Sequence, residues 1–522
     1  MSLAGNAPLR LGAVRGIRLF MFEAVELGRK VGKKEYADRV PELRESILQL
    51  QHELRDADDP VVVVLAGVEG AGRGDLINRL AQWLDMRDVE VHAFDRVSDE
   101  EASRPEFWRY WRTLPPKGRI GIYLNSWYTD PLFDRALDGG KRGRFERRLA
   151  RIARFERLLT EDGALLLKFW LHLSRKEQGD RLNALAKDER TKWRVTKARR
   201  ARHEAYKEVI EAAETAIRLT DTRSTPWTLV EAQSGRYRDL AVAQRLVEAL
   251  QQRLHPSRSH LPADLSSVES EVSSTHSIAS DPQNRSVLDT VHLRAELDDE
   301  TYDRELEAEQ ERVAELTRKA HNEGISTVLL FEGWDAAGKG GAIRRVTAAI
   351  DARYTRTISI AAPSAAEKAQ HYLWRFWRDV PRPGHVTIYD RSWYGRVLVE
   401  RVEGFAKTHE WMRAYAEIND FEDQLLDHGI VFQKYFIHIS PEEQLARFEA
   451  RKNIPWKRHK ITDEDWRNRE KWPDYVAAID EMVARTSTRI APWCLVAGND
   501  KKHARVTVLR TLRKQLEDRL GA

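Results

Sequence analysis

The sequence predicts an open, mostly parallel α/β sheet fold that occurs twice in tandem. Three observations predict it: a repeat that spans most of the chain, short β-branched runs that alternate with longer helical stretches, and a glycine-rich loop directly after one such run. Short apolar runs of this kind are typical of buried parallel strands. In the second copy we expect strands over 326–331, 386–389, 431–439 and 493–496, preceded by a charged helix over 302–322. Strands and helices in alternation predict an α/β sheet.

The repeat consists of residues that recur at one fixed spacing. The run WRYWR at 108–112 recurs as WRFWR at 374–378, an offset of 374 − 108 = 266. The same offset relates further pairs: Gly67 and Gly333, Lys168 and Lys434, His172 and His438, and Trp227 and Trp493. A single register over so long a stretch indicates a tandem duplication with almost no gaps.

Composition places the boundaries between the copies. Residues 255–299 include a stretch rich in serine with scattered proline and few aromatic residues, and such a stretch cannot bury enough apolar surface to fold by itself. We therefore expect a basic N-terminal extension over 1–34, a first domain over 35–254, a linker over 255–299 and a second domain over 300–522.

The bulk numbers exclude several classes of protein. Hydrophobic residues make up 42% of the 522, which suffices for ordinary globular cores, and the net charge is only +5. The longest apolar run is far shorter than the roughly 20 residues of a membrane span.

Cys494 is the single cysteine, so a disulfide within the chain is impossible and a reducing compartment, the cytoplasm, is expected. Arg10, Arg15 and Arg18 near the start suit either a surface-binding helix or a helix packed on its own domain.

The loop from Gly333 to Gly341 has the features of a phosphate cradle. It follows an expected buried strand and precedes an expected helix, and Gly333, Gly338, Gly340 and Gly341 allow successive N–H groups to converge on an anion. Lys339 adds a point charge for a phosphate group. The alternative is a tight turn with no ligand, and the lysine in register after the strand favours phosphate binding.

A metal ion in this cradle needs ligands other than the usual hydroxyl. The residue after Lys339 is Gly340, where phosphate loops normally have serine or threonine on Mg²⁺. Asp335 inside the loop is one candidate ligand, and Asp390, at the end of the strand over 386–389, is the other. Since ligands of parallel sheets bind at the carboxyl ends of the strands, Asp390 is expected to face the loop. A helix cap or a turn is the alternative role for Asp390.

Basic residues follow at several places in the second copy. Arg391 and Arg396 are candidates for neutralising charge on a transferred phosphoryl group, and a surface salt bridge is the alternative for each. Farther on, a basic segment broken by Pro455 is interpreted as a mobile lid that brings cations onto phosphates, with a solvated face as the alternative. The lid candidates are Arg447, Arg451, Lys457 and Lys460.

The first copy keeps the glycines but lacks these charges. At the positions of Lys339, Asp390 and Arg391 it has Arg73, Leu124 and Asn125. Leucine cannot bind a metal, and arginine does not replace lysine in a fitted site. The first copy is therefore expected to be catalytically silent. Its role is to pack against a partner domain, to hold an anionic substrate, or only to add stability.

These motifs together resemble the polyphosphate kinase 2 family. The residues that carry the resemblance are the loop GWDAAGKGG at 333–341, YDRSWYGR at 389–396, ERVEGF at 400–405 and the basic segment with Pro455, Lys457 and Lys460. The likeness covers the whole second copy and, more weakly, the first, as in the tandem polyphosphate:AMP phosphotransferase branch. One departure is His459, where the family's lid commonly has tryptophan.

The resemblance implies a P-loop kinase fold of the thymidylate-kinase type, with three αβα layers and a helical lid in each copy. It implies catalytic roles for Asp335, Lys339, Asp390 and Arg391, with Mg²⁺ on the two aspartates and Glu400 among the residues that bind phosphate or nucleotide. The implied reaction moves the terminal phosphoryl group of inorganic polyphosphate to AMP and gives ADP, with no nucleic acid or membrane as partner. A polyphosphate-dependent nucleoside diphosphate kinase, a non-catalytic polyphosphate- or nucleotide-binding regulator, and a homo-oligomeric assembly stay open.

Overall fold

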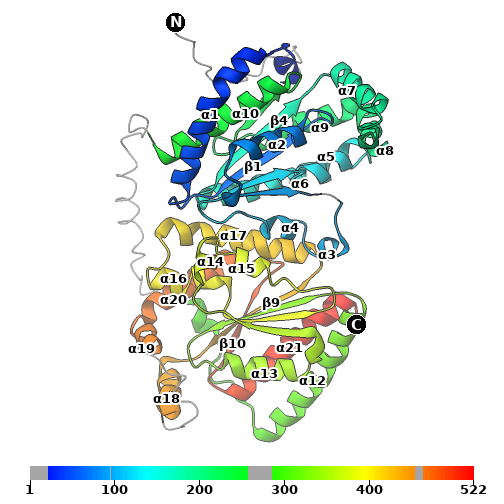
Figure 1. Ribbon diagram of the computed structural model, residues 1–522. Helices are drawn as coiled ribbons and strands as arrows, with labels where there is room; N and C mark the ends of the chain where they lie inside the picture. Colours follow the sequence, from blue (N-terminus) through cyan, green and yellow to red (C-terminus); the bar gives the residue numbers. More distant parts are fainter. Residues whose placement is uncertain (1–20, 95, 257–284, 453–462) are drawn as a thin grey trace, which may run out of the picture. The chain divides into compact units, whose positions relative to one another are not determined.

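The computed structural model describes residues 21–94, 96–256, 285–452 and 463–522 (Figure 1). The chain divides into two compact units, the first made of residues 1–95 and 117–256 and the second of residues 96–116 and 257–522. The segment 96–116 thus belongs to the first copy by sequence and to the second unit by its contacts. Arg10, Arg15 and Arg18 lie outside the described residues. Within the described ranges no helix is both long and apolar enough to cross a membrane.

The first unit has a five-stranded parallel sheet in the order β2-β3-β1-β4-β5. Its central strand β1 is a run of valines with leucine and alanine, and all residues but the last are buried, because helices cover both faces of the sheet. The strands are β1 (Val61–Gly67), β2 (Val89–Ala93), β3 (Ile120–Leu124), β4 (Leu165–His172) and β5 (Trp227–Glu231).

Helices α1, α2 and α10 cover one face of this sheet, and α5, α6 and α9 cover the other (Figure 1). Helices α7 and α8 follow β4, in the place where the resemblance expects a lid. The helices of the first unit are α1 (Lys33–Leu54), α2 (Arg73–Trp83), α5 (Thr129–Ala136), α6 (Arg142–Glu161), α7 (Arg175–Lys187), α8 (Lys197–Glu204), α9 (Tyr206–Thr220) and α10 (Gly235–Leu254).

The second unit repeats this sheet, again parallel throughout, in the order β10-β9-β6-β8-β7. Helices α12, α13 and α21 lie on one face, and α17 lies on the other with α20 packed against it (Figure 1). The strands are β6 (Thr327–Gly333), β7 (Thr355–Ser359), β8 (Val386–Asp390), β9 (Val431–His438) and β10 (Trp493–Ala497).

The helices of the second unit include two short ones, α3 and α4, from the segment 96–116. Trp111 of α4 stacks on Trp377 of α15 with ring centroids 5.6 Å apart, which joins the segment to this unit. The helices are α3 (Asp99–Ala102), α4 (Trp108–Trp111), α12 (Asp299–Asn322), α13 (Lys339–Ala348), α14 (Ala365–Lys368), α15 (Trp374–Trp377), α16 (Val399–Val402), α17 (Thr408–Asp427), α18 (Pro441–Lys452), α19 (Asp463–Glu470), α20 (Trp472–Thr486) and α21 (Lys501–Leu520).

The structure confirms the predicted fold class, a doubled α/β fold with parallel sheets between helices. The expected strands are present as β6, β8, β9 and β10, and the expected charged helix is α12. Strand β7 was not predicted. It pairs only with β8 at the edge of the sheet, and its residues are half-buried or exposed, so it lacks the apolar run that marks the inner strands.

Strand β6 ends where the chain comes very close to β9. Gly333 has φ 140°, and a Cβ atom at this position would lie 2.4 Å from the carbonyl oxygen of Ile437. Gly67 in the first unit has the same constraint, with a Cβ position 2.3 Å from the carbonyl oxygen of Leu171. Only glycine fits both the backbone conformation and the space, so this residue fixes where the following loop begins.

A buried ion pair holds the chain that follows β8. Lys434 in β9 is fully buried and lies 2.8 Å from Glu422 of α17. The same carboxylate accepts hydrogen bonds from Trp393 Nε1 at 3.0 Å and from the Tyr394 hydroxyl at 2.7 Å. Each partner satisfies the others, as a buried charge requires. The first unit repeats the arrangement with Lys168 and Glu156 at 2.7 Å.

Replacing Gly333 by alanine should destabilise the second unit, because the new methyl group meets backbone rather than a movable side chain. We expect a loss of more than about 1 kcal/mol in the free energy of unfolding. Gly340→Ala is the matched control, since nothing lies within 4 Å of its Cβ position in the first turn of α13. Urea unfolding of both variants measures the difference, and equal midpoints would contradict this account of β6.

Replacing Lys434 by methionine should leave the Glu422 carboxylate buried without its counter-charge, at a cost of about 3–5 kcal/mol. Adding Glu422→Gln removes that charge and keeps an oxygen for Trp393 and Tyr394, so the double variant should regain part of the loss. Urea unfolding of the single and double variants checks this. If the double variant is less stable than Lys434→Met alone, the unpaired charge of Glu422 is not the cause of the lost stability.

Candidate functional site

The loop after β6 forms the concave turn that the glycines predict. It leads directly into α13, whose first residue is Lys339 and whose N-terminal cap is Gly338 with φ 109°. Ala336 also has a left-handed backbone, with φ 62°. Alternating conformations of this kind turn consecutive N–H groups toward one point, and the N-terminal end of α13 adds a positive dipole there. The loop thus has the backbone geometry of an anion-binding turn.

The Lys339 side chain folds back onto its own loop. Its ammonium group donates hydrogen bonds to the carbonyl oxygens of Gly333 at 2.6 Å and Trp334 at 3.1 Å. Burial lowers the pKa of Lys339, and the neighbouring carboxylate of Asp335 offsets part of that shift. A phosphate group entering the loop would replace weak carbonyl partners by a full negative charge, which favours binding.

Asp335 is held between two donors. Its Oδ1 accepts from Arg391 Nη2 at 3.0 Å, and its Oδ2 accepts from Asn468 Nδ2 at 3.0 Å. Burial alone would raise the pKa of Asp335, but the charges of Lys339 and Arg391 and these hydrogen bonds outweigh it, so the pKa is lowered. The carboxylate is therefore ionised at neutral pH and oriented in the loop.

Asp390 and Arg391 stand at the same edge of the sheet. Asp390 is the last residue of β8, paired in register with Phe331 of the neighbouring strand β6. Arg391 has a left-handed backbone with φ 66°, and its N–H donates to the carbonyl oxygen of Phe331 at 3.0 Å. The carboxyl ends of β6 and β8 thereby bring together Asp335, Lys339, Asp390 and Arg391, as expected from parallel strands.

Glu332 is a buried acid at this edge that sequence reasoning missed. It accepts a hydrogen bond from the Ser392 hydroxyl at 2.7 Å. Burial raises the pKa of Glu332, while Ser392, Lys339 and Arg391 work against that rise. Within the strand Thr327–Gly333 it is the one charged residue among apolar neighbours, and that was the signal available in the sequence.

The carboxylates at this site suit a metal ion that takes most of its ligands from the phosphates of the substrate. In the part of the chain that the structure describes, no three His, Cys, Asp or Glu side chains form a metal-binding cluster. Mg²⁺ bound to phosphates commonly takes only one or two carboxylates from the protein. Asp335 and Asp390, beside a phosphate loop, fit that pattern.

Arg396 and Glu400 lie together but not on the loop. Arg396 Nε is 3.2 Å from Glu400, and its guanidinium group stacks over the Tyr372 ring at 4.6 Å. Burial raises the pKa of Glu400, and Arg396 offsets part of the rise. Among the described residues neither side chain makes a hydrogen bond or an ion pair with the loop.

The Arg447 side chain holds the loop in place through hydrogen bonds to its carbonyl oxygens. Its Nη1 donates to the carbonyl oxygens of Ala336 at 3.0 Å and Ala337 at 2.8 Å, and its Nη2 donates to Gly498 at 2.6 Å. The side chain is buried, so these carbonyls and not a solvent-exposed phosphate are its partners in this structure. Arg451 follows one turn later on α18. Lys457 and Lys460 lie outside the described residues.

An aromatic stack joins the loop to α20. The Trp334 ring lies flat on Trp472 of α20, with centroids 3.5 Å apart, and its Nε1 donates to His438 Nδ1 at 2.8 Å. Burial lowers the pKa of His438 to about 4, so the ring is neutral and can accept this bond near pH 7. Trp334 thus ties the loop to β9 and α20.

In the first unit the equivalent loop is filled by internal ion pairs. Glu69, which replaces Asp335, accepts from Arg202 at 2.6 Å and lies within 3.5 Å of both Arg73 and Arg199. Burial alone would raise the pKa of Glu69, but these three arginines lower it overall. Arg73 also donates to the Asn125 side chain at 3.2 Å. The charges left in this copy compensate one another.

Comparison with known proteins agrees with the doubled fold. The model of the family described as Polyphosphate kinase 2 (PPK2) matches residues 30–258 and again 296–521. A polyphosphate:AMP phosphotransferase of Pseudomonas aeruginosa is 46% identical, with 95% of this chain and 99% of that protein aligned.

Two further relatives differ in how much of the chain they match. A GDP-polyphosphate phosphotransferase of Mycobacterium tuberculosis is 38% identical over 42% of this chain and 74% of its own length. A crystal structure of a P. aeruginosa protein described as a polyphosphate kinase 2 superposes with a TM-score of 0.85 and 44% identity, covering 96% of this chain and 99% of that one. The chain belongs to the polyphosphate kinase 2 family.

Proposed function

We propose that this protein transfers the terminal phosphoryl group of inorganic polyphosphate to AMP, giving ADP, and that the second unit carries the reaction. The observation behind this is the gathering of Asp335, Lys339, Asp390 and Arg391 at one phosphate loop, in a chain that aligns over nearly its full length with polyphosphate:AMP phosphotransferases. Transfer between two phosphates needs no covalent intermediate on the protein. Positioning and charge stabilisation are enough.

The proposed roles follow from the contacts. Lys339 and the N–H groups of the loop hold the donor phosphate, and Arg391 neutralises charge on the transferred group. Asp335, ionised and fixed by Arg391 and Asn468, orients the acceptor phosphate and takes a proton from it where one is present. Asp335 and Asp390 would hold a Mg²⁺ ion, which would supply positive charge against the phosphate groups.

Two broader properties are part of the same proposal. The arginine-compensated loop of the first unit is catalytically silent, since its acid, Glu69, is occupied by three guanidinium groups. The working compartment is the cytoplasm, because a chain with one free cysteine suits reducing surroundings.

The choice of acceptor is tested by incubating the full-length protein with polyphosphate and Mg²⁺ and one of AMP, ADP, GMP or GDP. We expect AMP to be converted to ADP, measured by separating the nucleotides chromatographically. The relatives named for GDP and ADP match only about one copy of this chain. Consumption of ADP alone, with ATP as product, would replace AMP by a nucleoside diphosphate as the acceptor.

The asymmetry of the two units is tested by matched substitutions at equivalent positions. Lys339→Ala should lower the rate of AMP phosphorylation by about 100-fold or more, because it removes the charge at the centre of the cradle. Arg73→Ala should leave most of the activity. Unfolding midpoints of both variants separate loss of chemistry from loss of structure, and similar losses of activity with intact folding would contradict a silent first unit.

A further inference from the structure

The second unit has a cavity of about 660 Å³ at the end of the sheet opposite the catalytic loop. It is lined by the amino-terminal ends of β7 and β8 and by residues of α4 and α15, which pack against each other (Figure 1). Thr387 lines it, whereas Asp390 is three residues farther along β8, a separation of about 10 Å. The cavity is therefore a separate site, of a size that suits a small ligand.

Its lining is strongly basic. Six arginines line it, against two carboxylates, Glu100 and Asp379. Arg356 is paired with Asp379 at 2.7 Å, and Arg353 with Asp351 at 2.6 Å. The other four arginines have no carboxylate within salt-bridge distance among the residues described; they are Arg104, Arg112, Arg378 and Arg382.

These guanidinium groups are close enough to affect one another. Burial lowers the pKa of Arg104, Glu100 works against that shift, and the charges of Arg382 and Arg112 lower the pKa further. Arg104 is 7% exposed, and its Nε has no hydrogen-bond partner within the described part of the chain. A buried donor without a partner is costly, so an anion in the cavity would relieve both the repulsion and the unmet donor.

Two matching pairs of side chains contribute to this lining. Arg112 lies over the Trp108 ring at 4.7 Å, and Arg378 lies over the Trp374 ring at 4.9 Å. The second pair is the first one displaced by the repeat offset, 374 − 108 and 378 − 112 both being 266. The indole N–H groups of Trp108 and Trp374 are buried and make no hydrogen bond within the described ranges. Stacking holds each guanidinium plane in place with its N–H edges available.

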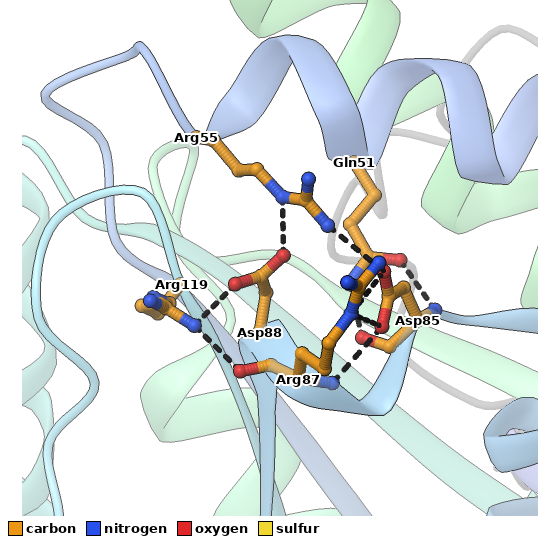
Figure 2. Close-up of polar contacts among 6 residues, drawn as sticks. All are labelled: Gln51, Arg55, Asp85, Arg87, Asp88 and Arg119. Atoms are coloured by element: carbon orange, nitrogen blue, oxygen red, sulfur yellow. Dashed lines mark hydrogen bonds and ion pairs between the residues drawn. The ribbon is translucent and has the colours of Figure 1, made fainter.

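The equivalent edge of the first unit carries a different arrangement of charges (Figure 2). There Asp88 is buried and accepts hydrogen bonds from both Arg55 and Arg119, and Arg55 also bonds Asp85 at 2.9 Å. The arginines at that edge are compensated by the chain itself.

In the second unit the position of Asp88 is taken by Tyr354, since 354 − 88 = 266. Tyr354 stacks on His321 with centroids 3.6 Å apart, and it lines the cavity. The Asp88 carboxylate therefore has no counterpart here, and its partners Arg55 and Arg119 correspond to His321 and His385, since 321 − 55 and 385 − 119 are both 266.

We propose that this cavity is a second binding site for an oligophosphate anion, distinct from the catalytic loop. Guanidinium groups bind phosphate oxygens in pairs, and four uncompensated ones match a ligand with charge on several successive phosphates. Linear inorganic polyphosphate and the triphosphate of a nucleotide share this chemistry. The cavity presents the same Trp–Arg pair twice. This favours inorganic polyphosphate over a nucleotide as the ligand, because the two halves of the inorganic chain are alike. The site binds without catalysing transfer, because it lacks the loop, the lysine and the paired aspartates.

The test is calorimetric titration of the full-length protein with tripolyphosphate and, separately, with ATP. The variant Arg112→Gln/Arg378→Gln/Arg382→Gln removes three exposed charges of the cavity. Tripolyphosphate should bind wild type at two sites, and the variant should retain one of them, with the other weakened about tenfold or more. AMP phosphorylation at saturating substrate should be unchanged, which also shows that the variant folds.

The matched control is Arg304→Gln/Arg344→Gln/Arg489→Gln, which removes the same charge from exposed positions outside the cavity. It should keep both sites. A loss of tripolyphosphate binding without a loss of ATP binding identifies the inorganic chain as ligand, and equal losses identify the triphosphate group common to both. Binding of tripolyphosphate that is the same in the cavity variant and the control would overturn the proposal.

Discussion

The buried pair of Lys434 and Glu422 is the interaction on which the site depends. Its carboxylate also binds Trp393 and Tyr394, which follow Asp390 and Arg391 in the chain by only two to four residues. The pair therefore fixes the turn that brings these charges toward the loop. The first unit has the same pair with nearly the same distance and yet lacks the aspartate and the arginine, so the scaffold and the chemistry can be separated.

Patterns along the chain predicted most of the fold. The inner strands of the sheet carry apolar runs and were found, whereas edge strand β7 carries none and was missed. The segment 96–116 could not be assigned from the repeat, because its place depends on contacts such as Trp111 on Trp377 and not on its own composition.

The placement of Asp335, Lys339 and Asp390 was predictable, because these residues lie on the loop or at the end of an adjacent strand. Arg447 shows the limit: a basic residue in a lid-like segment suggests a phosphate contact, but its guanidinium is bound to the carbonyl oxygens of Ala336 and Ala337. Which donor meets which acceptor is decided by side-chain packing, and spacing along the chain does not reveal it. Glu332 is the one charged residue of its strand, and the sequence did not reveal that Ser392 is its partner.

The backbone at Arg391 has a consequence for how the two copies differ in stability. A left-handed conformation costs a residue other than glycine roughly 1–3 kcal/mol, and asparagine tolerates it better than arginine. The first unit has Asn125 at this position, with φ 55°, while the second retains arginine with φ 66°. The first unit thus has a residue that suits its backbone. The second unit has a strained one, and under the proposed function this is a local loss of stability at a residue that acts in the reaction.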